Sequence, residues 1–280
     1  MIPQKVVAVY FSPVENTAKV VKAIAEMIAE RFSVDSDIPV EEIDFTLPDA
    51  REKTYHFGPE ELVVFGTPTY AGRVPNKILP FVQELFSAEN TPAVAAVTFG
   101  NRNFDSSLTE LTEELTKNGF KVFAAGAFAC HHVFSDKIAV GRPDEEDMKE
   151  LEEFVEGVAD KLGKAADAQA LTVPVIRDGA PVAPYYTPLK ADGEPAVFLK
   201  AKPVTDPALC VQCGACAARC PLASIDPDDF TQTPGLCIKC QACIVHCPTG
   251  ARSFDDEAFL SHVAYLEEHF TRRADNEAFF

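Results

Sequence analysis

The segment CVQCGACAARCP, residues 210–221, is followed by a near copy of itself, CIKCQACIVHCP, residues 237–248. Each copy has three cysteines with two residues between them, a fourth cysteine after three more residues, and then a proline. Together the copies contain eight of the nine cysteines in the chain. Thiolates at this spacing are typical of [4Fe-4S] clusters, and the fourth cysteine of each run binds the cluster of the other run. The sequence therefore predicts two clusters, one on Cys210, Cys213, Cys216 and Cys247, the other on Cys237, Cys240, Cys243 and Cys220.

Structural zinc is the main alternative, because Cys-x2-Cys pairs also describe zinc sites. A zinc site of four thiolates needs two pairs, whereas each copy here has three cysteines in register and a fourth beyond them. The pattern therefore favours iron and sulfur. A disulfide framework is disfavoured further, because the start of the chain, MIPQKVVAVYF, has no basic segment before an apolar one and no small-residue cleavage site. We expect a cytoplasmic protein.

The length of 280 residues is typical of two domains, and the net charge of −18 limits the partners. An acidic chain disfavours nucleic acid as a partner. No apolar run approaches the length that spans a membrane, so no membrane insertion is expected. The acidic surface has two interpretations: it attracts a redox partner protein with a basic surface, or it only keeps the protein soluble.

Residues 1–165 alternate short apolar runs with amphipathic stretches, which is typical of βαβ units around a parallel sheet. Five strands with helices between them predict an α/β, doubly wound, five-stranded parallel sheet. In such a fold, ligands bind beyond the carboxyl ends of the strands. The strands are predicted at 5–11, 40–45, 62–66, 93–99 and 121–129, and the helices at 16–31, from Pro75 onward, at 106–119 and at 144–162.

The rest of the chain divides into a linker and a small domain. Prolines recur between Pro174 and Pro203, so residues 166–202 are predicted to be a Pro-rich linker. It is either a plain tether or a semi-extended segment along a domain surface. Residues 203–280 are predicted to be a small α+β cluster domain that ends in a helix capped by Asp255.

Three loops follow predicted strands on the expected ligand side: FSPVENT at 11–17, GTPTYAGRVP at 66–75 and FGNRNF at 99–104. On this fold the loops resemble those of flavodoxins, in which the first loop binds the FMN phosphate and the other two contact the isoalloxazine ring. Residues 203–252 resemble two-cluster bacterial ferredoxins. The chain as a whole resembles a flavodoxin/ferredoxin fusion protein.

This resemblance implies an FMN site in residues 1–165. Tyr70 is expected to lie against the flavin, and the backbone at Ala71 and Gly72 is expected to meet the N5 edge of the ring. The residues that match the family's three loops are Ser12, Asn16 and Thr17 in the first, Thr67, Pro68, Tyr70, Ala71 and Gly72 in the second, and Gly100, Asn101, Arg102 and Phe104 in the third.

Two residues of the first loop depart from the family pattern. Val14 replaces a hydroxyl donor, and Glu15 replaces a glycine. Like charges a few ångströms apart repel by about 1 kcal/mol in water and by more when they are partly buried. Unless Glu15 points to solvent, we therefore expect it to weaken FMN binding.

Cys130, His131 and His132 follow the fifth predicted strand on the same side of the sheet. One interpretation makes a histidine the proton donor to reduced flavin or to a substrate, because imidazole titrates near neutral pH. The favoured interpretation is a buried thiol beside two surface imidazoles.

Three functions are compatible with these motifs. The first is an electron-transfer flavo-iron-sulfur protein that passes electrons between FMN and two [4Fe-4S] clusters. The second is an FMN-dependent reductase of a small organic substrate, with Arg73 and Arg102 available to bind an anion. The third is a ferredoxin whose FMN-free first domain serves only for docking. No G-x-G-x-x-G occurs, so the sequence gives no support for direct nicotinamide dinucleotide binding.

Overall fold

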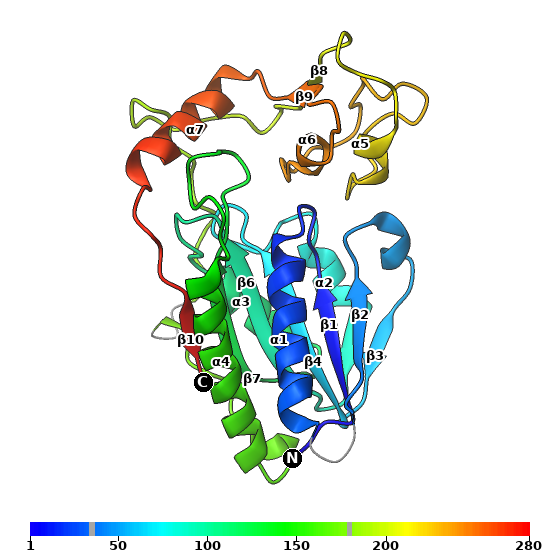
Figure 1. The fold of residues 1–280 in the computed structure, drawn as a ribbon, viewed down its shortest axis with the longest axis vertical. Helices are drawn as coiled ribbons and strands as arrows, with labels where there is room; N and C mark the ends of the chain where they lie inside the picture. Colours follow the sequence, from blue (N-terminus) through cyan, green and yellow to red (C-terminus); the bar gives the residue numbers. More distant parts are fainter. Residues whose placement is uncertain (34–36, 178–180) are drawn as a thin grey trace.

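The computed structural model describes residues 1–33, 37–177 and 181–280. An α/β part is built from the first 165 residues, and a smaller cysteine-rich part lies over one end of its sheet (Figure 1). None of the helices in these three ranges is long and apolar enough to cross a membrane.

The main sheet contains the five predicted strands. They pair in parallel in the order β2-β1-β4-β6-β7, which is a doubly wound order. Helices cover both faces, so the central strands are buried along almost their whole length. The strands are β1 (Lys5–Tyr10), β2 (Val40–Asp44), β4 (Glu61–Pro68), β6 (Pro92–Phe99) and β7 (Lys121–Ala129).

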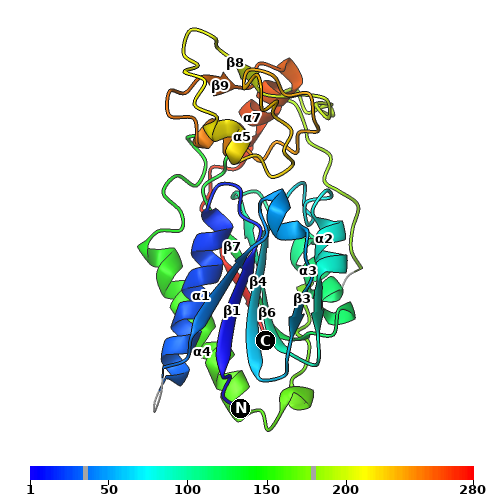
Figure 2. The same cartoon turned by 90° about the vertical axis from the view of Figure 1, so that its right-hand side faces the viewer.

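Two helices pack on each face of the sheet (Figure 2). On one face lie α1 (Asn16–Phe32) and α4 (Glu145–Lys164), and on the other α2 (Leu79–Leu85) and α3 (Ser107–Lys117). The helix predicted from Pro75 begins only at Leu79, because the Pro75 carbonyl first accepts from the Ile78 and Leu79 amides in a turn. A short 3-10 turn, Pro48–Arg51, and a small sheet of β3 (Tyr55–Phe57) and β5 (Phe86–Ala88) were not predicted.

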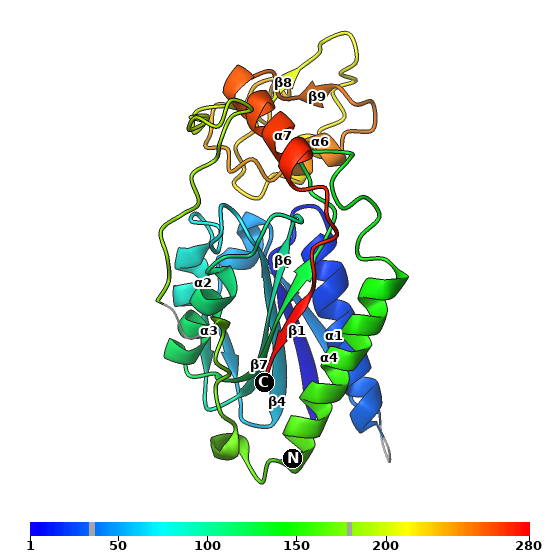
Figure 3. The ribbon, with the colours of Figure 1, turned by 90° about the vertical axis from the view of Figure 1, so that its left-hand side faces the viewer.

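The C-terminal segment differs from the prediction, because it returns to the first domain. There β10 (Glu277–Phe279) pairs antiparallel with β7, so the sheet has six strands, five of them parallel (Figure 3). The prediction placed all of residues 203–280 in the cluster domain. The edge of β7 offers unpaired amides and carbonyls, and the end of the chain satisfies them.

The cysteine-rich part has little regular structure. Its elements are β8 (Val204–Thr205) paired with β9 (Arg252–Ser253), α5 (Ala215–Ala218), α6 (Ala242–Val245) and α7 (Glu257–His269). The cap of α7 is Asp256, which accepts from the Phe259 amide, rather than Asp255. The duplication in sequence is also a duplication in backbone: Gln212 and Gly214 have positive φ in the first copy, and Lys239 and Gln241 have it at the same positions in the second.

The described part of the linker lies along both domains and is not a plain tether. The Tyr186 amide donates to the Ala71 carbonyl (2.8 Å), which fixes the linker to the sheet domain. The Leu189 carbonyl and His262 Nδ1 are 2.8 Å apart, which fixes it to α7. Residues 178–180 of the predicted linker lie outside the described residues.

Candidate functional site

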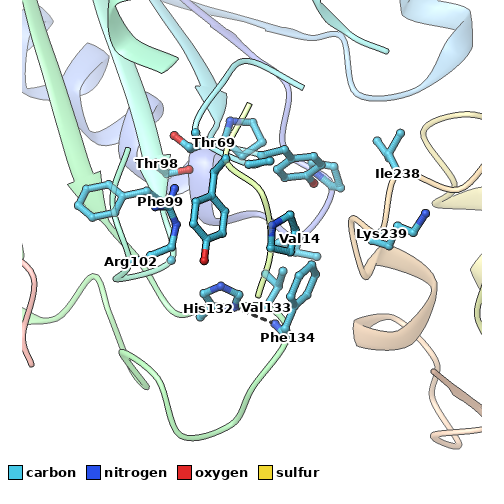
Figure 4. A pocket seen from close by; sticks show the side chains of 18 of the residues that line it. Val14, Thr69, Thr98, Phe99, Arg102, His132, Val133, Phe134, Ile238 and Lys239 are labelled. Carbon is cyan, nitrogen blue, oxygen red and sulfur yellow. Dashed lines mark hydrogen bonds between the residues drawn. The ribbon is translucent and has the colours of Figure 1, made fainter. Parts of the chain in front are cut away.

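A cavity of about 580 Å³ lies at the carboxyl end of the sheet, beneath the cysteine-rich part (Figure 4). Its lining comes from all three predicted loops, from the segment after β7, from the linker, from α7 and from the second cysteine run. Nine of the twelve residues predicted for FMN line it: Ser12, Asn16, Thr17, Pro68, Tyr70, Ala71, Gly72, Gly100 and Arg102. The volume lies in the range of small-molecule and cofactor sites.

The first loop leads directly into α1, a helix of 17 residues. The helix has no side-chain cap at Glu15; Ser12 Oγ instead accepts from the Ala18 amide at 2.9 Å. Thr17 Oγ1 lies 2.8 Å from Thr98 Oγ1. The first amides of a helix carry partial positive charge and bind phosphate well, so this end of the cavity has the donor chemistry that the FMN phosphate needs.

Glu15 does not point into the cavity. Its backbone is left-handed, with φ of 68°, which is the conformation that a glycine adopts without strain. Its side chain is 69% exposed and lies 3.5 Å from the guanidinium of Arg219 in the cysteine-rich part. The condition set by the sequence, that Glu15 face solvent, is therefore met, and the like-charge penalty at a phosphate is small.

The second loop places backbone and an aromatic ring at the cavity. Ala71 and Gly72 both have positive φ. A Cβ on Gly72 would lie 2.3 Å from Asp105 Oδ2, so no larger residue fits there without a shift. Burial, with Cys240 and Cys237 nearby, raises the pKa of Tyr70 well above its usual value. Tyr70 is therefore a neutral phenol, and it lies close to the second cysteine run.

Three predicted FMN residues do not line the cavity. Thr67 and Phe104 are buried in the protein, at 0% and 1% exposure. Asn101 holds the C-terminal segment: its Nδ2 donates to the carbonyls of Phe270 and Arg272, both at 2.7 Å, and its Oδ1 accepts from the Ala274 amide at 3.0 Å. Asn101 is therefore a structural tie, which motif matching within the first domain could not show.

The two arginines considered for anion binding already have partners. Arg73 pairs with the buried carboxylate of Glu110 and also donates to the Ala183 carbonyl of the linker at 2.8 Å. Arg102 pairs with Asp105, and its guanidinium lies 3.8 Å from the ring centre of Tyr186. Neither guanidinium is a free anion receptor.

The segment after β7 is partly as predicted. Cys130 is 2% exposed, and burial raises the pKa of its thiol to about 12, as expected of a structural cysteine. The imidazoles of His131 and His132 are not at an open surface, however; both line the cavity. Burial, followed by His262, His131 and Arg102, lowers the pKa of His132 to about 4, so its ring is neutral at physiological pH.

For the wall opposite the sheet, the sequence suggested only that the linker could lie along a domain surface. The wall is formed by aromatic side chains of the linker and α7 and by the loop of the second cysteine run. Ile238 and Lys239 reach the cavity from this loop (Figure 4), and Ile238 also packs on the core of the sheet domain. The sequence carried one signal for this wall, the aromatic residues within a Pro-rich linker. The lining residues of this wall are Tyr185, Tyr186, Pro188, Phe198, Leu199, Leu236, Cys237, Ile238, Lys239, His262 and Leu266.

The eight cysteines gather in the two predicted crossed sets. One small cavity is lined by Cys220 together with Cys237, Cys240 and Cys243, and another by Cys247 together with Cys210, Cys213 and Cys216. Within the described ranges, no three Cys, His, Asp or Glu side chains form a site for a single metal ion, and the four thiols of each set line a small cavity.

Backbone amides already point at several of these sulfurs. The Ser224 amide lies 3.3 Å from Cys220 Sγ, the Lys239 amide 3.4 Å from Cys237 Sγ and the Ala251 amide 3.2 Å from Cys247 Sγ. Such donors stabilise thiolate and tune the potential of iron-sulfur clusters. The donor sets therefore fit [4Fe-4S] clusters.

The 4Fe-4S binding domain family matches residues 203–226 and 231–253. The chain joins an α/β domain with the strand order of the flavodoxin-like fold to a region that matches 4Fe-4S binding domains. Solved structures similar to it include an archaeal flavodoxin (16% identity, 57% of this chain and 99% of that one, TM-score 0.40) and flavodoxin 2 of Bacillus cereus (16%, 56% and 99%, 0.40). An NADH:FMN oxidoreductase in its apo form is also similar (15%, 60% and 94%, 0.38). No curated protein matches the chain.

Proposed function

We propose that the protein is an electron carrier in which FMN, bound in the 580 Å³ cavity, exchanges electrons with the [4Fe-4S] cluster of Cys220, Cys237, Cys240 and Cys243. One observation carries the proposal: Cys237, a predicted ligand of that cluster, is itself part of the cavity wall. FMN supplies one- and two-electron chemistry, and each cluster accepts or gives one electron.

The residues of the chain bind and enclose the flavin. Ser12, Asn16 and Thr17, at the start of α1, would hold the phosphate. The Tyr186 amide fixes the linker to the Ala71 carbonyl of the second loop, and the aromatic wall would shield the ring from water. A flavin covered in this way, with Arg73 and Arg102 already paired with carboxylates, favours the carrier over a reductase with an open substrate site.

The cluster farther from the flavin, on Cys210, Cys213, Cys216 and Cys247, would exchange electrons with a partner protein. Of the eight cysteines in the two sets, Cys213 is exposed, and Val211, two residues before it, is 63% exposed. We propose that a redox partner with a basic surface docks at this end, because the net charge of the chain is −18. The free thiols of the two cysteine runs would persist in a reducing, cytoplasmic compartment. The rate of electron exchange with a basic partner is then expected to fall as ionic strength rises.

The test begins with anaerobic purification and measurement of iron, sulfide and FMN per chain. About eight irons and one FMN are expected from two four-iron clusters. The flavin is then reduced by light in the presence of a sacrificial donor, and the flavin absorbance and the cluster electron paramagnetic resonance (EPR) signals are followed together. Rapid equilibration between them supports the carrier. Four or fewer irons in fully loaded protein, or a flavin that reduces without any change in the clusters, would refute it.

A further inference from the structure

Arg51 is a buried cation that has no carboxylate partner among the described residues. It ends the 3-10 turn after β2 in the sheet domain, and its side chain is 8% exposed. Its Nη2 donates to the carbonyl of Pro221, across the junction with the cysteine-rich part, and its guanidinium lies 4.7 Å from the ring centre of Phe81. Its Nε and Nη1 are buried and have no hydrogen-bond partner in the described parts of the chain. An unpaired buried charge is strongly unfavourable, so a counter-charge is needed.

Cys220 is where that counter-charge would arise. It immediately precedes Pro221, the residue to which Arg51 is bonded, and it belongs to the cysteine set that borders the flavin cavity. As a free thiol Cys220 is neutral; as a cluster ligand it is a thiolate within a group of net negative charge.

We infer that Arg51 is the counter-charge of the cluster on Cys220, Cys237, Cys240 and Cys243 and raises its reduction potential. Reduction adds one electron from the flavin or another donor to this cluster, with no bond made or broken. The added negative charge is stabilised by a fixed cation, and a buried cation is little screened by salt. This inference rests on the two-cluster part of the proposed function.

The other cysteine set has its own arginine, which makes a matched comparison possible. Arg252 is 3% exposed, its Nη1 lies 3.9 Å from Cys216 Sγ, and its Nη2 donates to Thr233 Oγ1 at 2.6 Å. Arg252 belongs to the cysteine-rich part itself, whereas Arg51 comes from the sheet domain. The potential of the cluster nearer the flavin would therefore depend on the docking of the two domains, and that of the farther cluster would not.

The test is a potentiometric titration of the full-length holoprotein, with the two cluster signals followed by EPR. In Arg51→Gln and Arg51→Met, one cluster is expected to become harder to reduce by at least tenfold in its equilibrium, which is 59 mV for one electron. Arg51→Lys is expected to keep most of the wild-type potential, because it keeps the charge. Arg252→Gln is expected to shift the other signal more than this one, because Arg252 Nη1 lies 3.9 Å from Cys216 Sγ.

Each outcome is decisive. The inference would be overturned if fully loaded Arg51→Gln had unchanged potentials. It would also be overturned if Arg51→Lys shifted the potential as much as Arg51→Gln, because that result would implicate the bond to Pro221 rather than the charge. If both neutral variants lose four irons while Arg51→Lys retains them, the charge of Arg51 is needed to hold the cluster, and this result supports the inference. A fully loaded wild-type protein with four or fewer irons would refute the proposed function before any variant is made.

Discussion

Asn101 offers a direct test of the difference between a flavin ligand and a structural tie. Its side chain makes three hydrogen bonds to the C-terminal segment, at 2.7, 2.7 and 3.0 Å, and is 2% exposed. Its φ is 66°, so Asn101→Gly removes the side chain without straining the backbone. At about 1 kcal/mol for each bond, the change should cost about 3 kcal/mol.

That free energy should appear in the C-terminal segment and not in the cavity. Every 1.4 kcal/mol is a tenfold change in equilibrium, so the open form of the segment should become about a hundredfold more populated. Native-state hydrogen exchange measures this at the Ala274 amide and at β10, which pairs with β7. FMN content per chain should be unchanged, because Asn101 does not line the cavity.

Asn103→Gly is the matched control. It removes the same side chain from the same loop, at a residue that lines the cavity and whose side chain accepts from the Asp105 amide within its own loop. Exchange at Ala274 should then stay at the wild-type rate. If Asn101→Gly lowers FMN content and leaves exchange at Ala274 unchanged, Asn101 is a flavin ligand and not a structural tie.

Three further predictions concern single residues. Because glycine is unstrained at φ of 68°, Glu15→Gly should be more stable than Glu15→Ala by about 1 kcal/mol in denaturant unfolding, and the opposite order would contradict a strained loop. His132 should titrate near pH 4 by NMR. Since its pKa in the unfolded chain is about 6.5, its contribution to stability should be complete above pH 6.5 and should decline as the pH falls toward 4. A folded pKa near 6.5 would instead place the ring in water. Cys220→Ala should remove the cluster signal of the second cysteine run, and loss confined to the signal that Arg252→Gln shifts would disprove crossed ligation.

Much of the architecture follows from local patterns. The strand and helix periodicities are set by neighbouring residues, so the five parallel strands could be predicted within a few residues. The crossed cysteine sets could also be predicted, because three thiols at short spacing followed by a fourth that binds the other cluster are the known pattern of two-cluster sequences. The three loops were found because parallel strands bring their carboxyl ends to one edge.

What could not be predicted depends on contacts between distant segments. Neither the pairing of β10 with β7 nor the three bonds of Asn101 has a local signature, since the partners are more than 140 residues apart. The cavity wall has the same origin: Ile238 and the linker aromatics lie opposite the three loops only when the domains are docked. A motif can identify one half of such a site, but the chain supplies the other half from elsewhere.

The departures from the flavodoxin pattern become understandable at this junction. In an isolated domain, Glu15 would combine a strained backbone with a charge at the edge of a phosphate loop. In this chain the carboxylate turns toward Arg219 of the ferredoxin domain, while His246 Nε2 of that domain lies 3.3 Å from the Pro13 carbonyl in the same loop. An exposed ion pair contributes at most about 1 kcal/mol, so Arg219 does not hold the domains together. The ion pair instead orients the Glu15 carboxylate away from the cavity. Glutamate in place of glycine would be unfavourable in a free flavodoxin, and it is accommodated in this chain because the second domain is present.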